Sequence, residues 1–202
     1  MAYTLKDGGL FVKTARKVIE HYLRYKEIIF PEEIKKYEEK RGVFTTLRIK
    51  NDLRGCIGFP RPIYPLYKAL VLSSIAAATE DPRFPPLTLD ELNKTTIEIS
   101  ILTEPVLIEV NSPEEYLEKI EIGKDGLLLE YGIYSGLFLP EVPIEENWGI
   151  VEYLSYLCMK AGLEPDCWLK YKVKIYKFQS QIFREKEPNG EIEEIILKKN
   201  MS

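Results

Sequence analysis

The stretch VFTTLRIKNDLRGCIG, residues 43–58, decides how this chain folds. Its first eight residues alternate between two faces, which predicts a β-strand over 43–50. An Asn-Asp pair follows and supplies turn chemistry. The segment LRGCIG, residues 53–58, is then expected to return as the second strand of a hairpin, with Gly58 marking a bulge or the end of the strand.

The rest of the chain mixes helical and strand patterns without a regular alternation between them. Apolar residues recur at helical spacing over 10–26, and the apolar run over 66–78 is expected to form a buried helix. Strict alternation over 95–102 predicts another strand, and short turns join several neighbouring strands. The sequence therefore predicts an α+β fold with a mainly antiparallel sheet flanked by helices.

The composition is that of a globular protein and argues against one class of partner. The chain of 202 residues has a formal net charge of −4 and a sequence pI of about 5.3. Nucleic-acid-binding proteins usually carry a basic footprint, so we expect no nucleic-acid partner. The alternative is a basic stripe of lysines on a predicted strand over 170–178, but such a run usually forms a solvated sheet face.

No segment predicts a membrane anchor or a secretion signal, so we expect no membrane partner. The longest apolar run, over 66–78, is shorter than the roughly 20 residues that a membrane helix needs, and the N-terminus is short and polar. The three cysteines include no CxxC pair, which indicates a reducing, cytoplasmic setting rather than a disulfide framework. Charged residues are plentiful and Cys, Met and His are scarce, as in many thermophilic proteins.

Cys56 is the first candidate for chemistry, because Gly55 and Gly58 let another group approach its backbone closely. A nucleophilic cysteine acts as its thiolate, which nearby positive charge favours. Arg54 lies two residues away, so a regular strand places it on the same face as Cys56. We expect Arg54 to stabilise a thiolate or to bind an anion. The alternative is a small buried cysteine that fills a tight strand crossing.

The chain offers few partners for a catalytic or metal-binding cysteine. His21 is the only histidine, and its place at the edge of a helix stripe favours a surface role over that of a base. Cys158 falls on an apolar helix stripe and is assigned to the core, and Cys167 has no partner at ligand spacing. We therefore expect no metal site. The sequence has no Walker loop and no dinucleotide fingerprint, and we expect no cofactor.

The loop DPRFPP, residues 81–86, is a second candidate, because its prolines hold Asp81 and Arg83 in place. Rigidly supported loops often carry function, but an Asp-Arg pair also serves merely to fix a loop. Glu98 lies on the predicted strand over 95–102, opposite to its isoleucines. If that face lines a cleft, Glu98 is a candidate acid or base; if the face meets water, Glu98 is only an exposed residue.

Four blocks of sequence together resemble the AMMECR-one domain family, of the archaeal or bacterial type. They occur in the order and spacing of that family, and the resemblance extends from the first helix to residue 183. The blocks are LRGCIG at 53–58, DPRFPPLTLDEL at 81–92, FLPEVPIEENW at 138–148 and CMKAGL at 158–163. The family pattern also falls on Phe84 and Trp148.

The resemblance implies one domain over 1–185, made of two unequal subdomains with a cleft between them. Residues 186–202, outside the resemblance, are expected to form a charged tail. An Asn-Gly pair in the tail is suited to close a final hairpin, and a mobile tail is the alternative. The LRGCIG segment is expected near the cleft. Relatives of this family are often found beside Memo-type and radical S-adenosylmethionine proteins, which implies a shared pathway with such partners.

Two functions follow from these residues. The first is a binding module that performs no chemistry and receives a small anionic ligand or a partner protein in its cleft. The residues expected to contact the ligand are Arg54, Gly55, Gly58, Asp81, Arg83 and Trp148. The alternative is an enzyme in which Cys56 attacks an anionic substrate and Glu98 handles protons.

Overall fold

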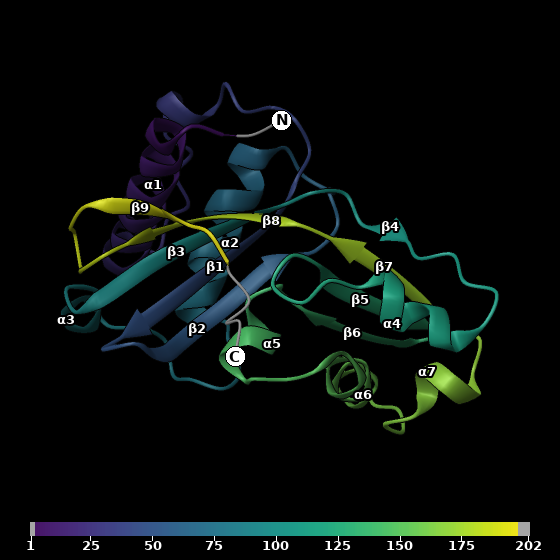
Figure 1. Ribbon diagram of the computed structural model, residues 1–202. Helices are drawn as coiled ribbons and strands as arrows, with labels where there is room; N and C mark the ends of the chain where they lie inside the picture. Colours follow the sequence, from purple (N-terminus) through teal and green to yellow (C-terminus); the bar gives the residue numbers. More distant parts are fainter. Residues whose placement is uncertain (1–2, 198–202) are drawn as a thin grey trace. The chain divides into compact units, whose positions relative to one another are not determined.

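The computed structural model of this protein describes residues 3–197 (Figure 1). The described part contains two antiparallel sheets and seven α-helices, which confirms the predicted α+β class. The helices are α1 (Leu5–Tyr25), α2 (Leu66–Thr79), α3 (Leu89–Leu92), α4 (Tyr116–Lys119), α5 (Val142–Glu145), α6 (Ile150–Lys160) and α7 (Cys167–Lys170), with the 3₁₀ turns η1 (Glu32–Ile34) and η2 (Pro113–Glu115).

The strands are divided between two compact units of the chain. Of the described residues, 3–102 and 181–196 form the first unit, and 103–180 with residue 197 form the second. The strands are β1 (Gly42–Ile49), β2 (Asp52–Phe59), β3 (Thr95–Leu102), β4 (Val106–Leu107), β5 (Gly126–Tyr131), β6 (Tyr134–Phe138), β7 (Lys174–Phe178), β8 (Ser180–Glu185) and β9 (Ile192–Ile195).

The first unit is built on a five-stranded sheet with the order β2-β1-β3-β8-β9. Strands β1 and β2 form the hairpin predicted over 43–58, and LRGCIG is its returning strand. Because β2 is paired only with β1, LRGCIG lies at an edge of the sheet.

The expectation of a bulge at Gly58 is wrong. Gly58 pairs regularly across the hairpin, whereas the register shifts between Leu47 and Arg48 on the opposite strand and leaves Arg54 as the extra residue. A bulge interrupts the alternation of side chains along a strand.

Helices α1 and α2 pack against this sheet (Figure 1). Helix α1 begins earlier than predicted, at Leu5, because Thr4 and Asp7 form a capping box in which each side chain accepts a backbone N–H of the other. Helix α2 follows the predicted run over 66–78 and is buried along most of its length. The core of the unit includes Phe11, Leu47, Leu70, Ile97 and Phe183.

The segment after residue 185 continues the first sheet. Strand β9 pairs antiparallel with β8, and Asn189 occupies the connection with a φ of 60°, which suits an Asn in a tight turn. The tail had two alternatives, a final hairpin or a mobile segment, and the structure contains the hairpin. The last part of the predicted tail, 198–202, lies outside the described residues.

The second unit is built on a four-stranded sheet with the order β4-β7-β5-β6. Helix α6 packs on β6 so closely that a Cβ atom at Gly136 would lie 2.7 Å from the backbone nitrogen of Ala161. The core of this unit includes Leu127, Leu129, Tyr153, Leu157 and Ile175.

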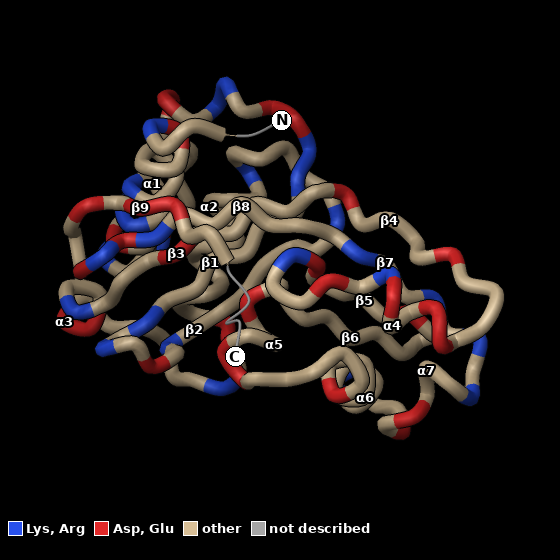
Figure 2. The backbone as a smooth tube through the Cα atoms, in the orientation of Figure 1, with Lys and Arg blue, Asp and Glu red and all other residues tan. Residues whose placement is uncertain are grey.

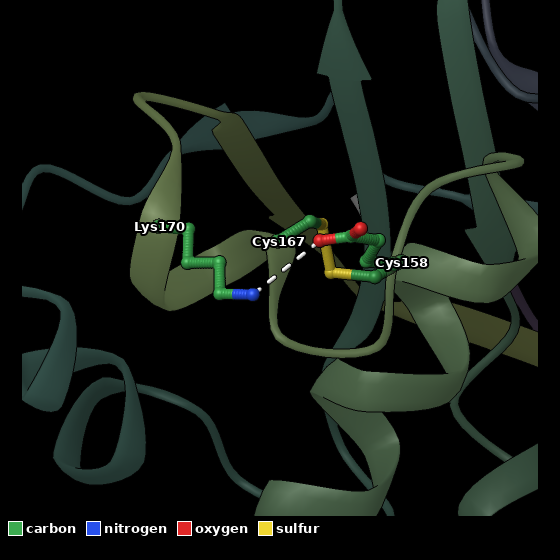
Figure 3. Close-up of a disulfide and its surroundings, with 4 residues drawn as sticks. Cys158, Cys167 and Lys170 are labelled. Carbon is green, nitrogen blue, oxygen red and sulfur yellow. Dashed lines mark hydrogen bonds and ion pairs between the residues drawn. A yellow bond between two sulfur atoms is a disulfide. The ribbon is translucent and has the colours of Figure 1, made fainter.

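A disulfide joins Cys158 on α6 to Cys167 at the start of α7 (Figure 3). Cys158 lies in the core as predicted, but the expectation that the cysteines form no disulfide is wrong. The two residues are nine positions apart, and the chain turns between the helices so that their side chains meet. Cys56 is the free cysteine.

Charges of both signs follow one another along the chain (Figure 2). The predicted strand over 170–178 begins only at Lys174, because Lys170 ends α7 and pairs with Asp166 at 2.8 Å (Figure 3). The lysines therefore do not form one stripe along a strand. Within residues 3–197, no helix has the length and apolar character needed to cross a membrane.

Candidate functional site

Cys56 lies on the edge strand β2, and its free thiol is partly exposed. The hydroxyl of Thr46, directly opposite on β1, donates a hydrogen bond to the Cys56 Sγ at 3.3 Å. A donor aimed at a sulfur favours the thiolate, because the charged form is the better acceptor. Because Cys56 is partly exposed, its thiol is not sealed in the core.

The outer edge of β2 is held by the loop that carries DPRFPP. Asp81, only 4% exposed, accepts a hydrogen bond from the backbone N–H of Cys56 at 2.8 Å. The same carboxylate accepts two bonds from the guanidinium of Arg83, from Nε at 3.0 Å and from Nη2 at 2.7 Å. The Asp81 carboxylate thus takes the N–H that a neighbouring strand would otherwise satisfy.

The pair of Asp81 and Arg83 is held in its charged form. Hydrogen bonds from Arg83 lower the pKa of Asp81 to about 2, against the opposing effect of burial. The bond to Asp81 also raises the pKa of Arg83, and the neighbouring Cys56 adds to that increase. The side chain of Arg83 is 50% exposed. A cation beside a partly exposed sulfur is the environment in which a thiolate or a bound anion is stabilised.

Arg54 is engaged with other groups. Its side chain, 11% exposed, forms a two-bond ion pair with Glu91 at 2.9 and 3.2 Å and donates to the carbonyl of Pro85 at 2.9 Å. It also lies over the ring of Phe84. The ion pair lowers the pKa of Glu91 to about 2. These contacts tie β2 to the DPRFPP loop and to α3, and they favour a structural role for Arg54.

Gly55 and Gly58 allow close packing of the backbone. A Cβ atom at Gly55 would lie 2.2 Å from the carbonyl oxygen of Ala77 on α2. One at Gly58 would lie 2.3 Å from the carbonyl oxygen of Val43 on β1. Both glycines sit in strand conformation, so LRGCIG needs them for the approach of neighbouring elements rather than for flexibility.

Glu98 shares a face of the sheet with Cys56. Thr46 on β1 pairs with Cys56 on one side and with Glu98 on β3 on the other, and paired residues point to the same face. Two strand spacings separate Cys56 from Glu98 by about 10 Å. Glu98 is 5% exposed, and its carboxylate lies 3.9 Å from the guanidinium of Arg184.

Two other residues considered from the sequence lie elsewhere. Trp148 belongs to the second unit, where its ring stacks on Tyr156 at 4.3 Å and meets Phe138 edge-on at 5.4 Å. His21 lies on α1 with its ring 4.8 Å from that of Tyr25. The structure thus groups Cys56 with Asp81 and Arg83, and Glu98 on the same sheet face.

Sequence reasoning missed Thr46, and the bulge explains why. A regular hairpin with the observed turn would place Thr45 opposite Cys56, whereas the extra residue Arg54 moves the register by one and brings Thr46 there. Glu91 was missed as the partner of Arg54, although its capping-box spacing after Thr88 is visible in the sequence.

The arrangement is suited to binding an anion or to presenting a thiolate. It combines a half-exposed guanidinium, a free thiol and a hydroxyl donor on adjacent strands and the loop beside them. Within the part of the chain that the structure describes, no group of three or more His, Cys, Asp or Glu side chains is placed to hold a metal ion.

Comparisons with known proteins agree with this fold. The family model described as AMMECR1 matches residues 12–183. Protein MJ0810 of Methanocaldococcus jannaschii is 56% identical over 191 residues, which cover 94% of this chain and 95% of that protein. Protein TK0174 of Thermococcus kodakarensis is 49% identical over 199 residues, with 94% and 97% covered.

A solved structure is similar over the same extent. The crystal structure of the uncharacterized protein PH0010 from Pyrococcus horikoshii superposes with a TM-score of 0.90 at 48% sequence identity. The match covers 94% of this chain and 97% of that one. These relatives are archaeal and include thermophiles, in line with the composition.

Proposed function

This chain belongs to the AMMECR1 family, and from that premise and the geometry around Cys56 we propose that it is a binding module for a ligand with an anionic group. Arg83 contacts that group, and Cys56 and Thr46 lie beside it. The observation that carries the proposal is the half-exposed guanidinium of Arg83, which Asp81 holds next to the free thiol.

The hydrogen bonds of Arg83 leave part of its guanidinium for a ligand. The Asp81 carboxylate accepts hydrogen bonds from Nε and Nη2 of Arg83. Within residues 3–197, Nη1 of Arg83 makes no hydrogen bond. A planar guanidinium binds carboxylate or phosphate through paired N–H groups, and it needs no deprotonation to do so. Its position is fixed before the ligand arrives, which reduces the entropy cost of binding.

Binding is favoured over catalysis because the carboxylates considered as bases are already engaged by arginines. A nucleophilic cysteine usually relies on a base within hydrogen-bond distance. Glu98, on the same sheet face, lies 3.9 Å from the guanidinium of Arg184. Asp81 is already charged and bonded to Arg83, and its low pKa makes it a poor base.

Protection of Cys56 from alkylation tests the proposal. The folded protein is treated with iodoacetamide with and without inorganic phosphate or succinate, and modification of Cys56 is followed by mass spectrometry. We expect either anion to slow the labelling, and Arg83→Gln to remove the protection. Lys94→Gln, which alters an exposed lysine whose side chain takes no part in the contacts described above, is the matched control and keeps the protection. Equal labelling with and without both anions contradicts the proposal.

The second candidate function is an enzyme that uses Cys56 as nucleophile on an anionic substrate. The hydrogen bond from Thr46 to Sγ favours it, because this donor stabilises the thiolate. Glu98 then exchanges protons through the substrate or a water molecule. Cys56→Ser separates the two functions: a binding module keeps its affinity for the anion, whereas the enzyme keeps the affinity and loses turnover.

We also propose a cytoplasmic location and a partnership with Memo-type and radical S-adenosylmethionine proteins. The support for the partnership is the sequence resemblance. Titration of this chain with a purified Memo-type protein, followed by light scattering, tests the partnership. A complex of defined mass supports it, and two unchanged species contradict it.

A further inference from the structure

A groove in the first unit lies between the start of α1 and the turn of the β8–β9 hairpin. Its volume is about 530 Å³, a size found in sites that hold small molecules. The lining is mainly apolar and includes Leu10, Tyr37 and Ile192. It contains no residue of the site around Cys56, so an occupant of the groove is a different ligand.

Lysines stand around this apolar surface. Lys6, Lys13 and Lys36 all line the groove. Within residues 3–197, Lys6 and Lys13 make no ion pair, and the ammonium group of Lys36 lies over the ring of Tyr37 at 5.0 Å. Two ammonium groups are therefore available to an occupant of the groove.

The two carboxylates of the lining are engaged by other partners. Asp7 accepts hydrogen bonds from the backbone N–H and the hydroxyl of Thr4 and from the hydroxyl of Tyr37. Glu191 pairs with Lys186 at 2.7 Å. The groove thus keeps an excess of positive charge in a chain whose net charge is −4. That charge complements an anionic occupant.

Gly9 gives an independent indication of an occupant. It lines the groove from inside α1, where glycine destabilises a helix relative to alanine. Its neighbour Gly8 is explained by packing, because a Cβ atom there would lie 2.1 Å from the ring of Phe183. A Cβ atom at Gly9 would meet no atom within 4 Å. The described protein gives no steric reason for this glycine, whereas a ligand that lies against the helix backbone supplies one.

We propose that this groove binds a small amphipathic acid. The apolar body of the ligand lies against Leu10, Tyr37 and Ile192 and reaches the bare backbone at Gly9. Its carboxylate or phosphate group pairs with Lys6 and Lys13. A purely apolar molecule leaves the ammonium groups unused, and a small hydrophilic anion leaves the apolar lining in contact with water, so both bind more weakly.

Calorimetric titration with three probes tests this proposal. Decanoate carries both an apolar body and an acid, 1-octanol carries only the body, and acetate carries only the acid. We expect the full chain to bind decanoate measurably, 1-octanol about tenfold more weakly, and acetate not at all, where tenfold corresponds to about 1.4 kcal/mol. Failure of decanoate to bind, or equal binding of decanoate and 1-octanol, overturns the proposal.

Gly9→Leu is the decisive variant, because it fills the floor of the groove without an internal clash. We expect it to melt at the same or a higher temperature than the wild type and to bind decanoate at least about tenfold more weakly. Lys6→Ala with Lys13→Ala weakens decanoate binding and leaves 1-octanol binding unchanged, whereas the control Lys94→Ala changes neither. Unaltered decanoate binding by a folded Gly9→Leu protein overturns the proposal. None of these variants affects the Cys56 site, so the outcome is independent of the proposed function.

Discussion

The carboxylate of Asp81 accepts the backbone N–H of Cys56 at 2.8 Å. This bond joins the edge strand of the five-stranded sheet to a proline-rich loop that follows α2. It brings Arg83 to the backbone of Cys56, because the same carboxylate binds the Arg83 guanidinium, and Nη2 of Arg83 lies 3.5 Å from the Cys56 carbonyl oxygen. The position of the cation beside Cys56 thus depends on one buried acid.

The first prediction concerns the pH dependence of that acid. Its pKa is about 2 in the folded protein, against an ordinary value of 3.8. Because the folded pKa is the lower one, Asp81 stabilises the protein above about pH 4, and this contribution is lost as the pH falls toward about 2. We expect Asp81→Asn to lower the free energy of unfolding at pH 7 by about 2 kcal/mol.

Urea unfolding of both proteins between pH 2 and pH 7 measures this effect. Other acids titrate in the same window, so the informative quantity is the difference between wild type and variant. That difference is expected to shrink as the pH falls. A difference that stays constant with pH means that Asp81 is not held in its charged form by the fold.

The second prediction separates the two arginines near LRGCIG. Arg54→Ala leaves Glu91 without its partner and removes the bond to the carbonyl of Pro85. We expect a loss of about 2–3 kcal/mol in the free energy of unfolding, the usual cost of a hydrogen-bonded charge pair. Arg83→Ala at the exposed end of its pair costs less stability but removes the anion site. Denaturant unfolding and the phosphate-protection assay measure the two effects.

A stable Arg54→Ala protein that no longer protects Cys56 in the presence of phosphate makes Arg54 a ligand residue, as the sequence first indicated.

The third prediction compares two neighbouring glycines of α1. Gly8→Ala forces a methyl group into the ring of Phe183, and we expect it to destabilise the protein by about 1–3 kcal/mol, as overpacking does. Gly9→Ala meets open space, and we expect it to stabilise by about 0.5–1 kcal/mol through helix propensity. Thermal melting of both variants checks the sign. Destabilisation by Gly9→Ala means that Gly9 has a structural role inside the protein.

The fourth prediction concerns the disulfide between Cys158 and Cys167. Thiol titration in denaturant is expected to find one free thiol per chain without reductant and three with it. Reduction removes a constraint on the unfolded chain, so Cys158→Ala with Cys167→Ala is expected to cost about 2–4 kcal/mol. Three thiols without reductant rule out the disulfide in the purified protein.

The β1–β2 hairpin could be predicted from the sequence, because the alternation of side chains along a strand and the Asn-Asp turn depend on only a few neighbouring residues. These patterns placed LRGCIG on a returning strand, but not the bulge at Arg54. The extra residue is set by contacts distant in sequence, namely those of Arg54 with Pro85 and Glu91. A shift of one residue changes the partner of Cys56 on β1 from Thr45 to Thr46.

The reading of the cysteines failed for a different reason. An odd number of cysteines without CxxC spacing predicts reduced thiols, but a helix, a turn and a second helix bring Cys158 and Cys167 together at a spacing that no motif marks. Intracellular proteins of hyperthermophilic archaea are rich in disulfides, so this bond is in line with the archaeal relatives.

The central claim is that Cys56 lies in a site that accepts anions through Arg83. The most direct measurement is the rate of Cys56 alkylation by anionic iodoacetate relative to neutral iodoacetamide, with glutathione as the reference thiol. We expect the ratio for the folded protein to exceed that of glutathione by about threefold or more at low salt, and to fall toward it in Arg83→Gln and at high salt. A ratio equal to that of glutathione, unchanged by Arg83→Gln, contradicts the account.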